Sequence, residues 1–346
     1  MRRFIIFLII IMNIPSIAYA ISAKSAVLID ASSGRVLYEH NANEQMPMAS
    51  TTKIMTGLLA CESKKLGNTV TVSPFASGTE GSSLWLSIGE KQSLENLTYG
   101  LLLKSGNDAA VAIAEYIGGS VDAFSSLMNE KAKKAGAKNT SFKNPHGLDA
   151  DGHYTTAYDL SLISREALKN KMFAKIVSTK NYTIPWEGNE WDRTLKNHNK
   201  LLWMYDGCNG VKTGFTKKSG RCLVSSAEKD GMQLICVTLN DPDDWNDHKA
   251  LLDYGYTNFK IKNICLKGQK WKDVEFGKKK KIPVLCKSSF SVALREDEEV
   301  KCIEKYKDTP KKADKGFKIG TLKFYLGETE IGQTDLVTGK KYKNIF

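Results

Sequence analysis

The sequence predicts an α+β protein, with two folded parts behind a cleavable leader. Strand-type hydrophobic patterns occur at both ends of residues 21–261, helical patterns fill the middle of that segment, and short β-prone runs follow from residue 262. A sheet built from the two ends, with a helical lobe inserted between them, explains this order. The 346 residues are 42% hydrophobic and 25% charged, a globular composition with room for a large and a small domain.

Residues 1–20 have the layout of a secretory signal peptide. The basic pair Arg2-Arg3 precedes an apolar run that ends at Met12, and a small-x-small sequence ends at Ala20. We expect cleavage after Ala20 and an exported, extracytoplasmic protein that is peripheral to the envelope or secreted. The alternative is an uncleaved N-terminal anchor, but the apolar run is short for a bilayer span.

The elements expected in residues 21–261 follow the order that this architecture requires. A β-hairpin comes first, helices separated by glycine and Asn-Pro breaks follow, and an antiparallel meander precedes a last helix. The hairpin is expected at 25–30 and 35–39, the helices at 94–104, 108–117, 121–135 and 156–169, the meander at 210–216, 222–227 and 233–240, and the last helix from 241.

Residues 262–346 are expected to form a separate, small all-β domain with a basic surface. This segment holds 21 Lys and Arg residues against 12 Asp and Glu residues, so +9 of the formal net charge of +12 lies here. We expect weak, salt-screened contacts with anionic cell-wall polymers or a membrane surface. The strands are expected at 274–276, 282–286, 290–294, 301–305 and 320–326.

Other kinds of chemistry have no support in the sequence. The five histidines show no metal-binding spacing and no glycine-rich phosphate loop is present, so we expect no metal, no cofactor and no nucleic-acid partner. The seven cysteines are an odd number without a C-x-x-C pair, which argues against a complete disulfide framework. They are expected to be buried hydrophobic residues or free thiols.

The segment after Pro47 is a candidate catalytic element. Ser50 is a good helix-capping residue, and apolar residues then recur at the spacing of a buried helical face, so we expect Ser50 to begin a core helix. Lys53 follows three residues later, so its amine projects beside the Ser50 hydroxyl, exposed in a cleft. The Ser50 N–H at the helix start can face an oxyanion. Ser226-Ala227-Glu228-Lys229 repeats the spacing, but within strand-type sequence that separates the two side chains.

Two further short segments are candidates for the same cleft. Ser105-Gly106-Asn107 lies in a break between helices and can present a hydroxyl and an amide, and Asn107 could also cap the helix that follows. Lys212-Thr213-Gly214 lies in a strand whose glycine leaves room for another backbone, with a solvated strand lysine as the alternative. Lys218-Ser219-Gly220 is a less favoured copy, because it falls in a turn.

Ser-x-x-Lys, Ser-x-Asn and Lys-Thr-Gly in this order resemble the signature of the penicillin-binding proteins and serine β-lactamases. More closely, the chain resembles the low-molecular-mass serine D-alanyl-D-alanine carboxypeptidases (peptidase family S11), including Asn144-Pro145-His146-Gly147 and the Tyr158-Asp159-Leu160 helix start. The resemblance covers nearly all of the mature chain. It implies a β-lactamase/transpeptidase-like catalytic domain at 21–261, followed by the all-β domain at 262–346.

The resemblance also implies roles for the candidate residues. Ser50 would be the nucleophile, Lys53 its general base, Ser105 a proton relay to the leaving amine, and Asn107 a group that holds Lys53 and the substrate amide. Lys212 and Thr213 would bind the terminal carboxylate of a peptidoglycan stem peptide ending in D-Ala-D-Ala. Gly214 and Phe215 belong to the strand that pairs with the peptide, and the Phe215 N–H would complete the oxyanion hole. β-Lactam antibiotics would be covalent inhibitors.

The sequence departs from the family pattern in two places. Some relatives have His where this chain has Phe215, and many end in an amphipathic membrane helix that we do not expect here. The alternatives are a serine β-lactamase, for which a Glu-x-x-Leu-Asn element is missing, and a non-catalytic β-lactam or wall sensor, for which no transmembrane segment is visible. The sequence leaves open whether the enzyme trims free peptides or cuts cross-links, and whether it serves vegetative wall or spore cortex.

Overall fold

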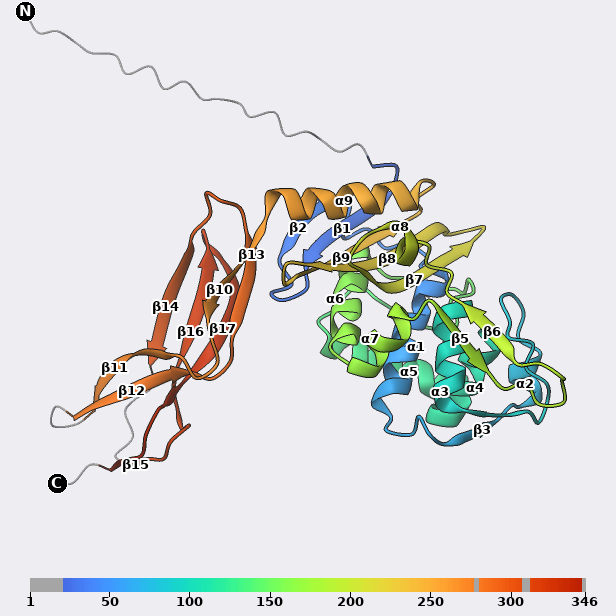
Figure 1. Ribbon diagram of the computed structural model, residues 1–346, viewed down its shortest axis with the longest axis horizontal. Helices are drawn as coiled ribbons and strands as arrows, with labels where there is room; N and C mark the ends of the chain where they lie inside the picture. Colours follow the sequence, from blue (N-terminus) through green and yellow to red (C-terminus); the bar gives the residue numbers. More distant parts are fainter. Residues whose placement is uncertain (1–20, 277–279, 307–311, 344–346) are drawn as a thin grey trace, which may run out of the picture.

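The structure is a computed structural model that describes residues 21–276, 280–306 and 312–343 (Figure 1). The predicted leader and its cleavage site lie outside these residues. In the described residues, none of the helices has the length and apolar character needed to cross a membrane.

A five-stranded antiparallel sheet organises the first part of the chain, in the order β2-β1-β9-β8-β7. The N-terminal β1 pairs with β9, for example at Val27 and Val237, so the two ends of this part meet in the middle of the sheet. This confirms the expected hairpin and meander. The strands are β1 (Ser25–Asp30), β2 (Val36–His40), β7 (Cys208–Thr216), β8 (Gly220–Lys229) and β9 (Met232–Leu239).

Helices cover both faces of this sheet (Figure 1). Successive residues of β1 enter different cores, because side chains alternate across a strand. Val27 and Ile29 pack in the large core shared with the helical lobe, whereas Ala26 and Leu28 pack against the opposite layer. That layer contains α9 (Asp244–Asn258), the last helix predicted from the sequence.

The helical lobe contains the predicted helices together with short helices at 74–77 and 201–204 and two small ladders that were not predicted. The helix expected at 94–104 begins as an α-helix and ends in a π-helical turn. The unpredicted ladders pair strands of only three or four residues, too short for a clear alternating pattern. The elements are η1 (Ala49–Thr52), α1 (Lys53–Glu62), β3 (Thr69–Thr71), α2 (Pro74–Ser77), β4 (Lys91–Ser93), α3 (Leu94–Tyr99), η2 (Gly100–Lys104), α4 (Asn107–Gly118), α5 (Val121–Lys134), α6 (Ala157–Leu168), α7 (Lys171–Ser178), β5 (Asn181–Ile184), β6 (Arg193–Lys196) and α8 (Leu201–Met204).

The C-terminal part is all-β, as predicted, and has its own core. Its main sheet has the antiparallel order β11-β12-β17-β16-β14, around Ile282, Leu322, Phe324 and Leu336. The strands are β10 (Lys260–Cys265), β11 (Lys270–Phe276), β12 (Lys280–Cys286), β13 (Phe290–Leu294), β14 (Val300–Tyr306), β15 (Lys312–Ala313), β16 (Lys318–Leu326), β17 (Thr329–Thr338) and β18 (Tyr342–Lys343). All seven cysteines are free.

The two parts meet where β13 lies against the β1–β2 hairpin (Figure 1). Buried Asp30 accepts a hydrogen bond from the Ala293 N–H at 3.1 Å, and Arg35 forms an ion pair with Glu298 at 2.5 Å. Phe259, which links α9 to β10, is 1% exposed and packs in the same core as Ala293. The division expected at residue 262 falls inside β10.

Candidate active site

Ser50 is the second residue of the 3₁₀ turn η1, which leads directly into α1. The expectation that Ser50 caps the helix is wrong: Met48 precedes η1, Thr52 precedes α1, and neither turn has a side-chain cap. The Ser50 hydroxyl therefore belongs to the 3₁₀ turn itself and does not precede it. The Lys53 Nζ lies 2.9 Å from the Ser50 Oγ, so the predicted pair is formed.

Lys53 is fully buried, which corrects the expectation of an exposed cleft lysine. Besides Ser50, its amine donates hydrogen bonds to Asn107 Oδ1 at 2.7 Å and to the His146 carbonyl at 2.6 Å. Burial, and then the positive charge of Lys212, hold the pKa of Lys53 well below its usual value. This amine therefore loses a proton more readily than an ordinary lysine does.

The Ser105-Gly106-Asn107 segment leads from η2 into α4, and within it Asn107 contacts the Lys53 amine. Ser105 has a left-handed backbone (φ 65°) and is 5% exposed. Asn107 is the first residue of α4 and Gly106 precedes that helix, so the capping alternative for Asn107 is wrong. The Asn107 side chain accepts from Lys53 and donates to the Glu80 carbonyl at 2.6 Å, which fixes its orientation.

Lys212, Thr213 and Gly214 lie on β7, the edge strand nearest η1. Lys212 is 1% exposed and donates to the Thr213 carbonyl at 2.8 Å, so the alternative of a solvated lysine is wrong. Burial lowers its pKa to about 7. A Cβ atom on Gly214 would lie 3.0 Å from the Ser50 nitrogen, which explains why the strand needs glycine there.

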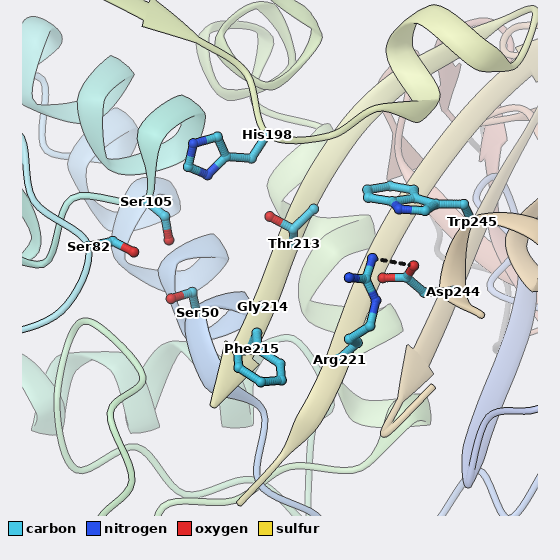
Figure 2. Close-up of a pocket in the computed structure, with 10 residues that line it drawn as sticks. All are labelled: Ser50, Ser82, Ser105, His198, Thr213, Gly214, Phe215, Arg221, Asp244 and Trp245. Carbon is cyan, nitrogen blue, oxygen red and sulfur yellow. Dashed lines mark hydrogen bonds and ion pairs between the residues drawn. The ribbon is translucent and has the colours of Figure 1, made fainter. Parts of the chain in front are cut away.

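These segments surround one cleft of about 300 Å³ (Figure 2). Arg221 forms an ion pair with Asp244 at 2.6 Å and lies over the Trp245 ring at 5.6 Å. Sequence reasoning missed five of the lining residues, because they come from four separate segments that share no motif. These five are Ser82, His198, Arg221, Asp244 and Trp245. The cleft is lined by Ser50, Ser82, Ser105, His198, Thr213, Gly214, Phe215, Arg221, Asp244 and Trp245.

The Asn144-Pro145-His146-Gly147 segment packs against η1 and α1, the elements that carry Ser50 and Lys53. The Pro145 carbonyl accepts a hydrogen bond from the Thr56 hydroxyl at 2.6 Å, and the His146 carbonyl accepts from Lys53. Gly147 has a φ of +94°, and a Cβ atom there would lie 1.9 Å from the Ala49 carbonyl oxygen. Only glycine permits this approach, so the segment can hold η1 and Lys53 in place.

The second Ser-x-x-Lys copy forms no such pair. Ser226 is fully buried in β8 and accepts a hydrogen bond from Gln233 at 3.0 Å, while the Lys229 amine lies 4.4 Å from the centre of the Tyr205 ring. The Lys218-Ser219-Gly220 copy lies at the turn into β8, where Gly220 has a φ of +66°.

The fold and the cleft place this molecule in the class of penicillin-binding serine enzymes. A solved structure of penicillin-binding protein 5 from Haemophilus influenzae superimposes with a TM-score of 0.79 at 28% identity, covering 93% of this chain and 98% of that one. The chain belongs to the peptidase S11 family of D-alanyl-D-alanine carboxypeptidases, whose family model matches residues 12–243. A second model, the penicillin-binding protein 5 C-terminal domain, matches residues 259–344.

Named relatives agree with this family. The chain is 37% identical to D-alanyl-D-alanine carboxypeptidase DacF of Bacillus subtilis over 314 residues, which is 87% of this chain and 80% of the relative. It is 33% identical to D-alanyl-D-alanine carboxypeptidase DacD of Escherichia coli over 340 residues, covering 92% and 86% of the two chains. The family resemblance drawn from the motifs is confirmed.

Proposed function

We propose that this protein is a serine D-alanyl-D-alanine carboxypeptidase that removes the terminal D-Ala from peptidoglycan stem peptides. The observation that carries the proposal is the buried Lys53 amine, 2.9 Å from the Ser50 Oγ and with a lowered pKa. A neutral amine at this distance can take the hydroxyl proton while the oxygen attacks a carbonyl.

The first half of the proposed reaction forms an acyl-enzyme. The Ser50 Oγ bonds to the carbonyl carbon of the penultimate D-Ala, Lys53 takes the hydroxyl proton, and the N–H groups of Ser50 and Phe215 stabilise the oxyanion. The C–N bond then breaks, and the leaving D-Ala amine receives the proton through Ser105. Water completes the cycle by hydrolysing the ester. The close approach of Gly214 to Ser50 supports this pairing of η1 with β7.

Substrate recognition is proposed at the strand β7. Thr213 lines the cleft and lies next to Lys212, so the two are placed to bind the terminal carboxylate through a charge-assisted hydrogen bond. Asn107 would hold both Lys53 and the substrate amide. β-Lactams would acylate Ser50 in the same way.

The proposal extends to location and domain organisation. We propose that residues 1–20 are a signal peptide, that the protein works outside the cytoplasm, and that its catalytic domain ends with α9. The basic C-terminal domain would hold it peripherally at anionic wall polymers or lipid headgroups, which the excess of Lys and Arg residues supports.

The direct test compares Ser50 with Ser226, because each lies three residues before a lysine. Ser50→Ala should abolish both the penicilloyl adduct seen by mass spectrometry and the release of D-Ala from a D-Ala-D-Ala peptide, because the covalent centre is lost. Ser226→Ala should keep the adduct, since Ser226 is buried away from the cleft. An adduct on Ser226, or an undiminished adduct in Ser50→Ala, would overturn the assignment. Rapid loss of the adduct from the wild type would instead favour a β-lactamase.

A further inference from the structure

Three of the seven cysteines lie together in the core of the C-terminal domain. Cys265 is the last residue of β10, Cys286 is the last residue of β12, and Cys302 lies in β14. Cys265 and Cys286 are each 1% exposed and pack in the core that contains Ile282 and Leu322. The half-buried Cys302 packs against the same core. This thiol cluster is separate from the proposed catalytic site.

Within the thiol cluster, Cys265 and Cys286 are the pair in direct contact. Their thiols lie within hydrogen-bonding distance of each other, whereas Cys302 interacts with them only electrostatically. The Cys265 thiol also donates to the Ser288 carbonyl at 3.6 Å, just after the end of β12. The Cys286 N–H donates to the Gln269 carbonyl at 3.0 Å, so the backbones on both sides are held close together. Such proximity is what a disulfide requires.

The contact between these two thiols joins two different sheets. Cys265 lies in the two-stranded β10–β13 sheet, whereas Cys286 lies in the main five-stranded sheet. The chain enters the C-terminal domain through β10, directly after α9 (Figure 1). A bond between the two sulfurs would fix this entering strand to the main sheet. It would also close a loop of about twenty residues, which limits the conformations of the unfolded chain.

We propose that Cys265 and Cys286 form a disulfide when the exported chain folds, and that Cys302 stays a free thiol. The oxidant is a second disulfide, carried by a small molecule or by an exported oxidoreductase. One cysteine thiolate attacks this disulfide, forms a mixed disulfide and releases one thiol. The other cysteine then attacks the first, and the second thiol leaves. Two electrons and two protons pass to the oxidant, which ends as two thiols.

The burial of the pair determines when the bond can form. Burial, and then the neighbouring Cys265, raise the pKa of Cys286 to about 12 in the folded protein. The thiolate is the form that attacks a disulfide, so it is scarce once the core has closed. The bond therefore forms while the chain folds. After folding, the same burial protects the bond from reductants in solution.

The experiment refolds the reduced, denatured full chain in a mixture of reduced and oxidised glutathione. Remaining thiols are then alkylated, and the protein is digested without reduction and mapped by mass spectrometry. Wild type is compared with Cys265→Ala, which removes one partner, and with Cys302→Ala, which removes the third thiol of the cluster. Cys208→Ala is the matched control, because it removes a half-buried thiol outside the C-terminal domain. Thermal unfolding of each variant checks that the fold is kept.

We expect wild type, Cys302→Ala and Cys208→Ala to yield one linked peptide pair that joins Cys265 to Cys286. Cys265→Ala should yield no such pair. The oxidised wild type should melt about 5 °C or more above the reduced wild type, and this difference should disappear in Cys265→Ala. Reduced protein that is already folded should form the bond at least about tenfold more slowly than the refolding chain.

Three results would overturn the proposal. Alkylation of both Cys265 and Cys286 in refolded wild type would show that the bond does not form. A linked peptide that contains Cys302 in most molecules would show that the pairing is different. Equal melting temperatures of oxidised and reduced wild type would show that the bond does not fix β10 to the main sheet. All of these measurements are made without substrate, so they do not depend on the proposed catalytic function.

Discussion

The charge state of Lys53 depends on a second buried lysine. Lys212 is the second-largest cause of the lowered pKa of Lys53, after burial, and both amines are withdrawn from solvent. Replacing Lys212 by Met removes this charge and keeps a chain of similar length. The pKa of Lys53 should then rise, so the acidic limb of penicillin acylation against pH should move to higher pH, with slower acylation at pH 7.

The control for this prediction is Lys138→Gln, which removes an exposed charge that is remote from both lysines in the sequence. It should leave the pH profile unchanged. If Lys212→Met lowered the rate equally at every pH, Lys212 would act only in binding and would have no influence on the protonation of Lys53. The measurement is the second-order acylation rate from pH 5 to 10.

The sequence predicted which residues would lie together better than it predicted their environment. The three motifs named Ser50, Lys53, Ser105, Asn107 and Lys212, and the structure brings these residues together. The burial of Lys53 was not predictable from the helix pattern, because its hydrogen-bond partners include the His146 carbonyl, 93 residues further along the chain. Arg221, Asp244 and Trp245 carried no signal, since each is ordinary in its own segment.

The site depends on how closely β7 approaches η1. A Cβ atom at Gly214 would lie 3.0 Å from the Ser50 nitrogen and 3.1 Å from both the Thr51 nitrogen and the Ala49 Cβ. Gly214→Ala should therefore push the strand from the turn by a few tenths of an ångström, disturb the oxyanion donors, and slow penicillin acylation about tenfold.

Gly67 provides a matched comparison for this substitution. An added Cβ there meets nothing within 4 Å, so Gly67→Ala should keep wild-type acylation and change stability by about 1 kcal/mol or less. Acylation rates and thermal unfolding distinguish the two variants. Normal acylation in Gly214→Ala would mean that the strand and η1 are not held in contact during the reaction.

Most of the long elements were predicted, although the ten-residue β17 was not, and the short ladders of the lobe were missed. The meander and the helices of the lobe follow clear hydrophobic periods, whereas β3 to β6 are short ladders whose strands are fixed by tertiary contacts. One such contact is the Arg193–Glu90 pair at 2.5 Å, in which both side chains are almost fully buried. Patterns in the sequence do not reveal a pair that is 103 residues apart.

The buried histidines should lower the free energy of unfolding of the protein in acid. Burial is the largest cause that lowers the pKa to about 3 for His146 and His248 and to about 4 for His153. As the pH falls, the three histidines take up protons near pH 6.5 in the unfolded chain, but only near pH 3 to 4 in the folded protein. Stability is therefore complete above about pH 6.5 and falls as the pH drops towards 4, by about 1.4 kcal/mol per pH unit for each fully buried histidine.

Asp241 acts in the opposite direction, because burial raises its pKa to about 6, but it is outnumbered by the three histidines. Urea unfolding at pH 7 and pH 5 measures the balance. The free energy of unfolding should be lower at pH 5, and an equal or higher value would contradict the prediction.

The basic C-terminal domain is expected to bind the envelope through its charge. All three catalytic motifs precede Phe259, whereas residues 262–346 carry a net charge of +9. The full-length protein should bind envelope fractions at low ionic strength and be released by high salt without detergent. A chain that ends at Phe259 should lose this binding and keep penicillin acylation. Its melting temperature should fall, because the Ala293 packing and the Arg35–Glu298 pair are removed from the hairpin.

Ser50→Ala in the full-length protein separates envelope binding from recognition of wall peptides by the active site. This variant keeps the basic domain and should bind and be released by salt like the wild type, since the screened charges lie far along the chain from the cleft. Retention of the wild type at high salt until detergent is added would show a firmer anchor than charge. Binding by the truncated chain would locate the contact in the catalytic domain, and either outcome would overturn the role proposed for residues 262–346.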